Sequence, residues 1–216
     1  MLAGDHLDAV EFERRYDAMP DTKKAELIEG IVYMPSPVRL TQHGRPHGHL
    51  ATWIGVYEAS TPGVLMGDDS TLRLDTKNRP QADASLMIDP AKGGQAKLID
   101  DYIVGGPELL AEVSASTASM DLNTKLEVYR RAKVREYVVW RVEDEEIDWF
   151  VLRRGRFARL APQDGILKSE IFPGLWLDPA ALARLHLARV LEVVGMGIAS
   201  PEHAAFVARL QAAPTT

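Results

Sequence analysis

The first third of the chain switches between helical and strand-like spacing of its apolar residues. Residues 7–19 place apolar side chains at intervals that favour a modest helix, which ends at Pro20. The run AELIEGIVYM alternates around Gly30 and predicts a pair of short strands. Over residues 42–60 apolar side chains recur near the 3.6-residue period, so we expect a second helix there.

The middle of the chain has the two-residue alternation of strands. In residues 64–75 and 81–89 apolar and polar side chains alternate, and proline, glycine and asparagine residues flank these runs. This pattern predicts two neighbouring strands. Residues 91–106 contain four glycines and predict an excursion between strands, with a short hairpin at residues 102–104. A third strand, PELLAEVS, follows directly.

Beyond this strand the pattern predicts the order strand, helix, strand. Residues 119–132 have helical spacing, and REYVVWRV is typical of a buried strand. DWFVLRR and GRFARLAP predict two further strands. PAALARLHLARVLEVVG and SPEHAAFVARLQAA predict two C-terminal helices, the second with Ser200 as N-cap and Pro201 in its first turn.

Length and composition are those of an ordinary globular protein. The chain has 216 residues, 46% of them hydrophobic, which is enough for one main domain. We divide it into a core over residues 21–178 and a C-terminal helical extension over residues 179–212. No apolar run reaches the ~20 residues that span a bilayer, and the N-terminus carries acids where a signal peptide needs basic residues. We therefore expect a cytoplasmic protein without a membrane partner.

The chain contains no cysteine, so disulfides, zinc-thiolate sites and thiol nucleophiles are excluded together. Histidine, carboxylate and main-chain oxygen are the metal ligands left, and they favour hard cations such as Mg²⁺. The net charge of −6 argues against nucleic-acid binding by the whole surface. This net charge does not exclude a local groove that binds nucleic acid.

Two acids lie inside predicted strands. Asp83 is in QADASLMID and Glu112 is in PELLAEVS, where a buried carboxylate without partners is strongly unfavourable. By strand parity Leu110, Glu112 and Ser114 share one face. If the two strands are neighbours, the acids can converge and need a shared proton or a cation. An acid exposed at a strand end, or paired with arginine, explains the spacing equally well.

Lys125 follows Glu112 by thirteen residues, on the helix that leaves the same strand. Its ammonium could lie over the carboxylate pair and offset charge on a phosphate. The alternative is an exposed i,i+4 pair with Asp121, worth ~0.3 kcal/mol.

ELIEGIVYMPSP, QADASLMI and GGPELLAEVSASTASMDLNTKLEVYRRAKVREYVVWRV occur in this order. Together they resemble the Uma family of putative restriction endonucleases, in the PD-(D/E)XK nuclease superfamily, over roughly residues 27–142. The resemblance implies an α/β (α+β) fold, with a restriction-endonuclease-like central mixed sheet flanked by helices. Its most specific positions are Glu112, Ser114, Ser116, Thr117, Asp121, Lys125, Tyr129, Glu136 and Tyr137.

The resemblance also implies a site. Asp83, Glu112 and the Val113 carbonyl would hold Mg²⁺ or Mn²⁺, and Glu26 would reach the metal through water. Ala82 stands where the motif has proline, and Ser114 where the superfamily usually has its lysine, so Lys125 is the replacement. The residues expected to support the ligands or contact substrate are Ser114, Gln81, Asp121, Tyr129 and His49.

His43 and His47 are four residues apart, as are Arg45 and His49. The spacing could suit a metal pair, but without a third ligand we favour a solvated helix near the site mouth, with His49 able to touch substrate. A phosphate-binding rim could come from Arg130, Arg131, Lys133, Arg135, Arg153, Arg154, Arg156 and Arg159.

The functional hypothesis is a Mg²⁺-dependent endodeoxyribonuclease, a hydrolase that cleaves DNA phosphodiester bonds. One alternative is a catalytically weak or inactive nuclease-fold module that binds nucleic acid or a protein partner. Another is a hydrolase of a different substrate, which fold resemblance does not exclude. A homodimer would suit cleavage of both strands of a duplex.

Overall fold

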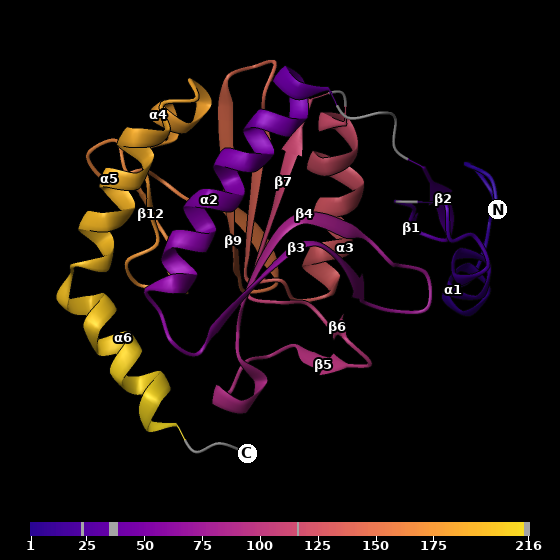
Figure 1. Cartoon of the computed structure of the whole chain (residues 1–216), viewed down its shortest axis with the longest axis horizontal. Helices are drawn as coiled ribbons and strands as arrows, with labels where there is room; N and C mark the ends of the chain where they lie inside the picture. Colours follow the sequence, from indigo (N-terminus) through magenta and orange to yellow (C-terminus); the bar gives the residue numbers. More distant parts are fainter. Residues whose placement is uncertain (23, 35–38, 116, 214–216) are drawn as a thin grey trace.

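The computed structural model describes residues 1–22, 24–34, 39–115 and 117–213. Its centre is an eight-stranded sheet in which neighbouring strands are antiparallel, except for the parallel pairs β7–β8 and β3–β6 (Figure 1). The mixed α/β fold expected from sequence is confirmed. Across the sheet the order is β10 (Arg156–Arg159), β9 (Glu146–Arg153), β8 (Glu136–Arg141), β7 (Leu109–Ser114), β4 (Gln81–Ile88), β3 (Val64–Arg73), β6 (Tyr102–Val104) and β5 (Lys97–Ile99).

Helices cover both faces of this sheet (Figure 1). On one face lies α2 (Arg45–Ala59), preceded by a π-helical turn, η1 (Leu40–Gly44). Its apolar stripe packs on the strand residues that face it, including Ala111 and Val113. On the other face another π-helical turn, η3 (Met120–Lys125), leads into α3 (Leu126–Arg131), which packs against Leu110 and Tyr137. Residues of β7 therefore alternate between the two cores, as the parity argument predicts.

The N-terminal elements form a small core of their own around Phe12, Leu27 and Val32. It joins α1 (Ala9–Asp17), whose N-cap is Asp8, to the hairpin of β1 (Glu26–Ile28) and β2 (Ile31–Tyr33). The two hairpin turn residues, Glu29 and Gly30, have φ values of 52° and 76°. Positive φ at both positions is the geometry that favours glycine in tight two-residue hairpins.

Three regions differ from the pattern-based expectation. A hairpin was predicted at residues 102–104, after β4 and the 3₁₀ turn η2 (Pro90–Lys92). It is present but longer, because it consists of β5 and β6, and β6 pairs with β3 so that both strands join the main sheet. The single helix expected over residues 179–195 is wrong: α4 (Pro179–Ala183) and α5 (Leu187–Ile198) are separate, because the chain turns at Leu185 with a φ of 59°. A two-stranded sheet of β11 (Leu167–Lys168) and β12 (Trp176–Leu177) was not foreseen.

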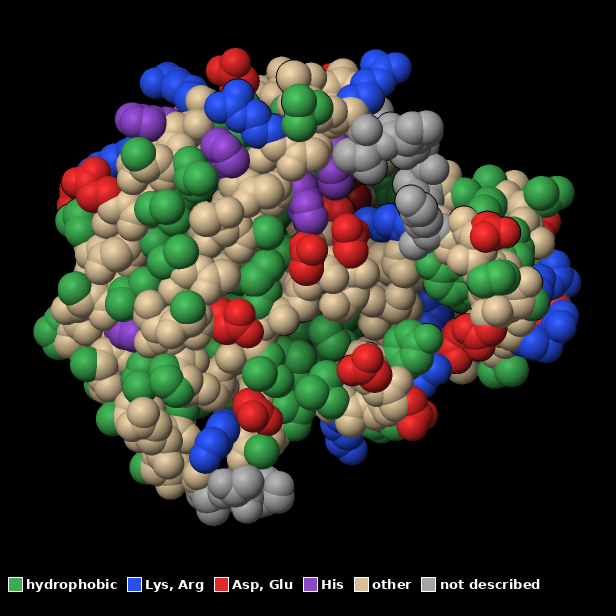
Figure 2. All heavy atoms as spheres, viewed as in Figure 1, with side chains coloured by type: hydrophobic (Ala, Val, Ile, Leu, Met, Phe, Trp, Pro, Cys, Tyr) green, Lys and Arg blue, Asp and Glu red, His purple; other side chains and the backbone are tan. Residues whose placement is uncertain are grey.

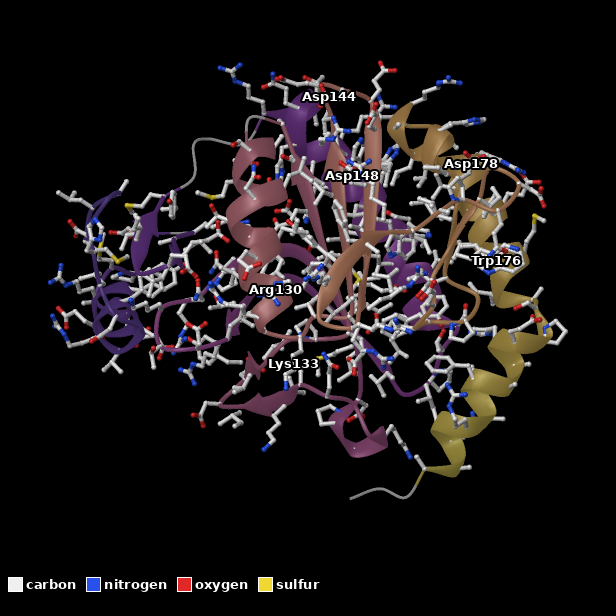
Figure 3. The ribbon with its side chains drawn as sticks, turned by 180° about the vertical axis from the view of Figure 1, so that it is seen from behind. Arg130, Lys133, Asp144, Asp148, Trp176 and Asp178 are labelled. Atoms are coloured by element: carbon white, nitrogen blue, oxygen red, sulfur yellow. The ribbon has the colours of Figure 1, made fainter. Side chains whose placement is uncertain are left out.

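The C-terminal part is fastened to α2. The Trp53 indole N–H donates to the Trp176 carbonyl at 2.9 Å, and the Tyr57 hydroxyl donates to the Pro173 carbonyl at 2.9 Å. Figure 3 shows Trp176 beside the C-terminal helices. The last helix, α6 (Pro201–Ala212), has the predicted cap, since Ser200 accepts from the backbone N–H of His203. The hydrogen bonds of Trp53 and Tyr57 thus tie α2 to the segment that precedes α4.

Among the described residues, no single helix is long and apolar enough to cross a membrane, whereas α5 and α6, bent by 65°, pass that test only as a pair.

Candidate active site

Asp83 and Glu112 lie opposite each other on neighbouring strands. β4 and β7 pair in antiparallel register with Ala84 opposite Ala111, so one further step places Asp83 opposite Glu112. The regular pairing stops before that step, and the Val113 backbone N–H donates instead to Asp83 Oδ2 at 2.7 Å. Both carboxylates are buried, with 3% and 4% of their residue surface exposed. The alternative of an acid exposed at a strand end is therefore wrong.

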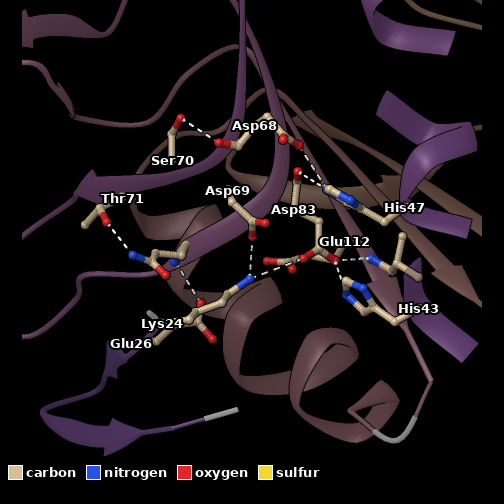
Figure 4. A network of polar contacts seen from close by, with 12 residues as sticks. Lys24, Glu26, His43, His47, Asp68, Asp69, Ser70, Thr71, Asp83 and Glu112 are labelled. Carbon is tan, nitrogen blue, oxygen red and sulfur yellow. Dashed lines mark hydrogen bonds and ion pairs between the residues drawn. The ribbon is translucent and has the colours of Figure 1, made fainter. Parts of the chain in front are cut away.

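The Asp83 carboxylate is surrounded by donors from three other parts of the chain (Figure 4). Its Oδ2 lies 3.3 Å from His43 Nε2, and its Oδ1 lies 3.3 Å from Lys24 Nζ. Burial alone would raise the pKa of Asp83, but His43, Lys24 and the Val113 N–H outweigh it and lower the pKa below its usual range. Asp83 is therefore ionised at neutral pH.

Glu112 is held through one of its two oxygens. Lys125 Nζ lies 3.0 Å from Oε1, and the Tyr129 hydroxyl donates to the same atom at 2.8 Å. Among the residues that the structure describes, none donates a hydrogen bond to Oε2. Burial raises the pKa of Glu112 to about 8, opposed by Lys125 and assisted by the neighbouring acids Asp83, Asp121 and Glu26. The site carries more negative charge than its own lysines neutralise.

Lys125 lies inside the cluster and is not an exposed helical residue. Its Nζ is 3.0 Å from Glu26 Oε1 and 3.9 Å from Asp121 Oδ1, in addition to its contact with Glu112. Burial lowers the pKa of Lys125, but these three carboxylates raise it well above its usual range. The alternative of a solvated i,i+4 pair with Asp121 is wrong, because both residues are buried.

The remaining predicted residues support these groups. Gln81 donates its backbone N–H to Glu26 Oε1 at 2.8 Å. Ser114 Oγ lies 3.3 Å from Thr117 Oγ1, which donates to Asp121 Oδ2 at 2.6 Å. Ser114 therefore supports Asp121, the acid next to Lys125. Ser116, part of the sequence resemblance, lies outside the described residues.

The histidines correct the sequence interpretation. His47 Nε2 lies 3.0 Å from both the Asp83 carbonyl oxygen and Asp68 Oδ1, while His43 contacts the Asp83 carboxylate. The preference for a solvated helix is thus wrong for this pair, whose rings stack at 5.6 Å. His49, the residue proposed to touch substrate, has no hydrogen-bond partner for its buried Nδ1 within the described ranges.

Sequence reasoning missed Lys24, Asp68 and Asp69. Asp68 pairs with Ala84 and Ser70 with Ala82, so Asp69 lies opposite Asp83 in unbroken antiparallel register, with a φ of 46°. Asp69 Oδ1 lies 2.7 Å from Lys24 Nζ. Two consecutive acids within an alternating strand were the available signal, because both cannot face solvent on a regular strand.

The site opens on the surface seen in Figure 2, where histidine, acidic and basic side chains gather in a hollow of the molecule. The predicted arginine rim is largely engaged elsewhere. Arg130 and Lys133 are seen from behind in Figure 3, and Arg130 is paired with Glu127. Arg131, Arg153 and Arg159 are paired with Glu29, Glu170 and Asp148.

Comparison with known proteins identifies the family and the fold. The profile of the Uma2 family, described as "Putative restriction endonuclease", matches residues 9–180. The fold is similar to a crystal structure of a putative nuclease belonging to DUF820 from Anabaena variabilis ATCC 29413, with a TM-score of 0.59 and 12% identity, covering 79% of this chain and 97% of that one. Comparison with curated proteins gave no match. The resemblance inferred from sequence is confirmed, and the chain belongs to the Uma2 family.

Proposed function

We propose that the protein is a metal-dependent endonuclease that hydrolyses DNA phosphodiester bonds, with Mg²⁺ or Mn²⁺ held by Asp83, Glu112 and the Val113 carbonyl. The main support is that the two oxygens of each carboxylate differ in their hydrogen-bond donors. Asp83 Oδ2 and Glu112 Oε1 accept from the protein's own donors. Asp83 Oδ1 has Lys24 as its one donor among the described residues, at 3.3 Å, and Glu112 Oε2 has none. Each acid thus has one oxygen with few or no protein donors, which a cation could contact.

The third ligand follows from strand geometry. In an extended strand, the N–H and C=O of one residue point to the same edge. The Val113 N–H points to Asp83, so the Val113 carbonyl also points to the edge between β7 and β4. Three oxygen ligands and no sulfur suit a hard divalent cation.

The charge balance also suits a cation. Asp83, Glu112, Glu26 and Asp121 surround two lysines, and this excess of acid is part of the reason for the raised Glu112 pKa. A bound divalent cation would supply Lewis-acid chemistry, which stabilises negative charge on the scissile phosphate and favours attack by water.

Lys125 would act as a fixed ammonium and not as a base. Three carboxylates raise its pKa, so it keeps its proton at neutral pH. From that position it can offset charge on the phosphate and orient the attacking water. Tyr129 and Lys125 together hold Glu112 Oε1, which fixes the direction of the carboxylate.

The test is nicking of supercoiled plasmid with and without Mn²⁺. Asp83→Asn and Lys125→Met should each lose at least about 100-fold in rate, as loss of a charge-stabilising group typically does. Lys97→Met, on the exposed edge strand β5, should cleave like the wild type. Equal cleavage by the wild type and both site variants would refute the proposal and point to a contaminant.

One observation favours a rival, the catalytically weak binding module. The half-exposed acids Asp68 and Asp69 lie beside the site and would repel a phosphate backbone. Calorimetry with Mn²⁺, combined with the nicking assay on DNA and RNA, separates the two. Mn²⁺ binding without cleavage of either polymer would support the binding module, whereas cleavage would reject it.

A further inference from the structure

We propose that His43 and His47 are positioning residues that clamp Asp83 from two directions and keep its Oδ1 directed at the metal. The inference rests on the proposed metal site, but not on the DNA substrate. It assigns a role to two stacked histidines that neither the motif nor the family description includes.

The clamp acts on two different atoms of one residue. His43 Nε2 lies 3.3 Å from the carboxylate Oδ2, and His47 Nε2 lies 3.0 Å from the main-chain carbonyl (Figure 4). Within the described part of the chain, the three polar atoms that these nitrogens contact are oxygen acceptors: Asp83 Oδ2, the Asp83 carbonyl and Asp68 Oδ1. Each Nε2 therefore carries a hydrogen and donates.

The local backbone explains how two successive turns reach one residue. His43 lies in the π-helical turn η1, in which the Gly44 N–H donates to the Arg39 carbonyl at 3.1 Å. His47 lies in the first turn of α2. A π turn adds a residue to the helical circuit, and such turns recur at functional sites. The rings then stack with their planes 26° apart, each supporting the other.

The consequence concerns the orientation of the carboxylate. With the Val113 N–H and His43 both on Oδ2, rotation of the group about its Cβ–Cγ bond would break one hydrogen bond and one ion-pair contact. Oδ1 is thereby kept on the side of Lys24. Groups that orient metal ligands in this way typically change metal affinity 10–100-fold when they are removed.

The α2 helix is itself a rigid support for the clamp. Its far end is fastened to the C-terminal part through Trp53 and Tyr57, and its apolar stripe is fully buried on the sheet. The position of His43 relative to β4 is therefore set by packing and not by a mobile loop.

The experiment measures Mn²⁺ affinity by calorimetry on the full chain, with thermal melts to verify folding. His43→Ala should raise the Mn²⁺ dissociation constant about tenfold or more. His43→Gln should stay within about threefold of wild type, because its amide can donate from near the Nε2 position. His186→Ala, which removes an exposed histidine before α5, is the matched control and should bind like wild type.

If His43→Ala fails to fold, His43→Phe takes its place, since it keeps the stacked ring and removes the donor. Wild-type Mn²⁺ affinity in His43→Ala or His43→Phe, whichever folds, would overturn the inference. A loss of affinity in His43→Gln as large as in that variant would also overturn it, because it would indicate that the histidine binds the metal directly. Absence of Mn²⁺ binding by the wild type would overturn it together with the proposed metal site. A wild type that binds Mn²⁺ but cleaves no DNA, with the predicted order among variants, would support the clamp while rejecting the nuclease.

Discussion

Glu112 illustrates the conflict between function and stability in this site, and Glu112→Gln should make the metal-free protein more stable. The substitution keeps the shape of the side chain and an Oε1 acceptor for Lys125 and Tyr129. It removes a buried carboxyl group whose ionised form is unfavourable beside the other acids, Asp83 and Glu26. Acids that hold metals are expected to lower stability when no metal is bound.

The magnitude follows from the pKa of Glu112, which burial and the neighbouring acids raise from 4.5 to about 8. A tenfold change in proton affinity is worth about 1.4 kcal/mol, so the full effect is about 5 kcal/mol and the part expressed at pH 7 is about 3 kcal/mol. Between pH 4.5 and about 8 the folded state binds a proton that the unfolded chain releases. The stability contribution of Glu112 therefore falls as the pH rises through this window, and glutamine removes that slope.

Urea unfolding at pH 5, 6, 7 and 8, with EDTA or with Mn²⁺, measures both effects. In EDTA at pH 7 Glu112→Gln should exceed the wild type by ~1–3 kcal/mol, and the difference should grow with pH. With Mn²⁺ at 100 times the dissociation constant the wild type should gain about 3 kcal/mol and the variant far less, so the advantage of the variant should largely disappear. Glu143→Gln, an exposed acid, controls for net charge. A variant that is no more stable than the wild type in EDTA at pH 8 would refute the reasoning.

Two further predictions concern the C-terminal helices. His203 Nε2 lies 3.0 Å from Thr61 Oγ1, and burial lowers the pKa of His203. The unfolded chain therefore binds a proton at this histidine more readily than the folded protein, and stability should decrease as the pH is lowered below about 6.5. In urea titrations from pH 7 to 5, His203→Gln should lose less stability than the wild type, and equal slopes would contradict this. Gly197→Ala should lower the thermal midpoint through ~1–3 kcal/mol of overpacking, because its Cβ would lie 2.1 Å from the Gly174 carbonyl oxygen. Gly195→Ala, with nothing within 4 Å, should instead gain up to ~1 kcal/mol from helix propensity, so equal losses in both would argue against the close contact.

Local pattern was sufficient for the elements that carry the site and insufficient for long-range placement. The alternation in β7 predicted which residues share a face of the sheet, because side-chain direction in a strand depends only on parity. The pairing of β6 with β3 was not predictable, since it depends on a chain excursion that returns to a distant edge. The break at Leu185 carries no glycine or proline signal, so the helical period of the run hid it.

The same distinction applies to the site. Asp83 and Glu112 were detectable because an acid within an apolar strand contradicts its surroundings. Lys24 and His43 gave no such contradiction, since each lies in a polar segment where charge is ordinary. Their role arises only when a loop before β1 and the first turn before α2 meet at Asp83. The proximity of Lys24 and His43 to Asp83 results from the tertiary fold and is not visible in a single sequence.

The position of Lys125 has a consequence for how the charged cluster is assembled. A lysine at the position of Ser114 would come from the same strand as Glu112, whereas Lys125 comes from η3 and lies buried. A buried ammonium needs several partners to offset its desolvation. One of them, Glu26, belongs to the N-terminal hairpin. The N-terminal core is thus joined to the site by charge, so Glu26 serves to hold the lysine whether or not it also reaches the metal.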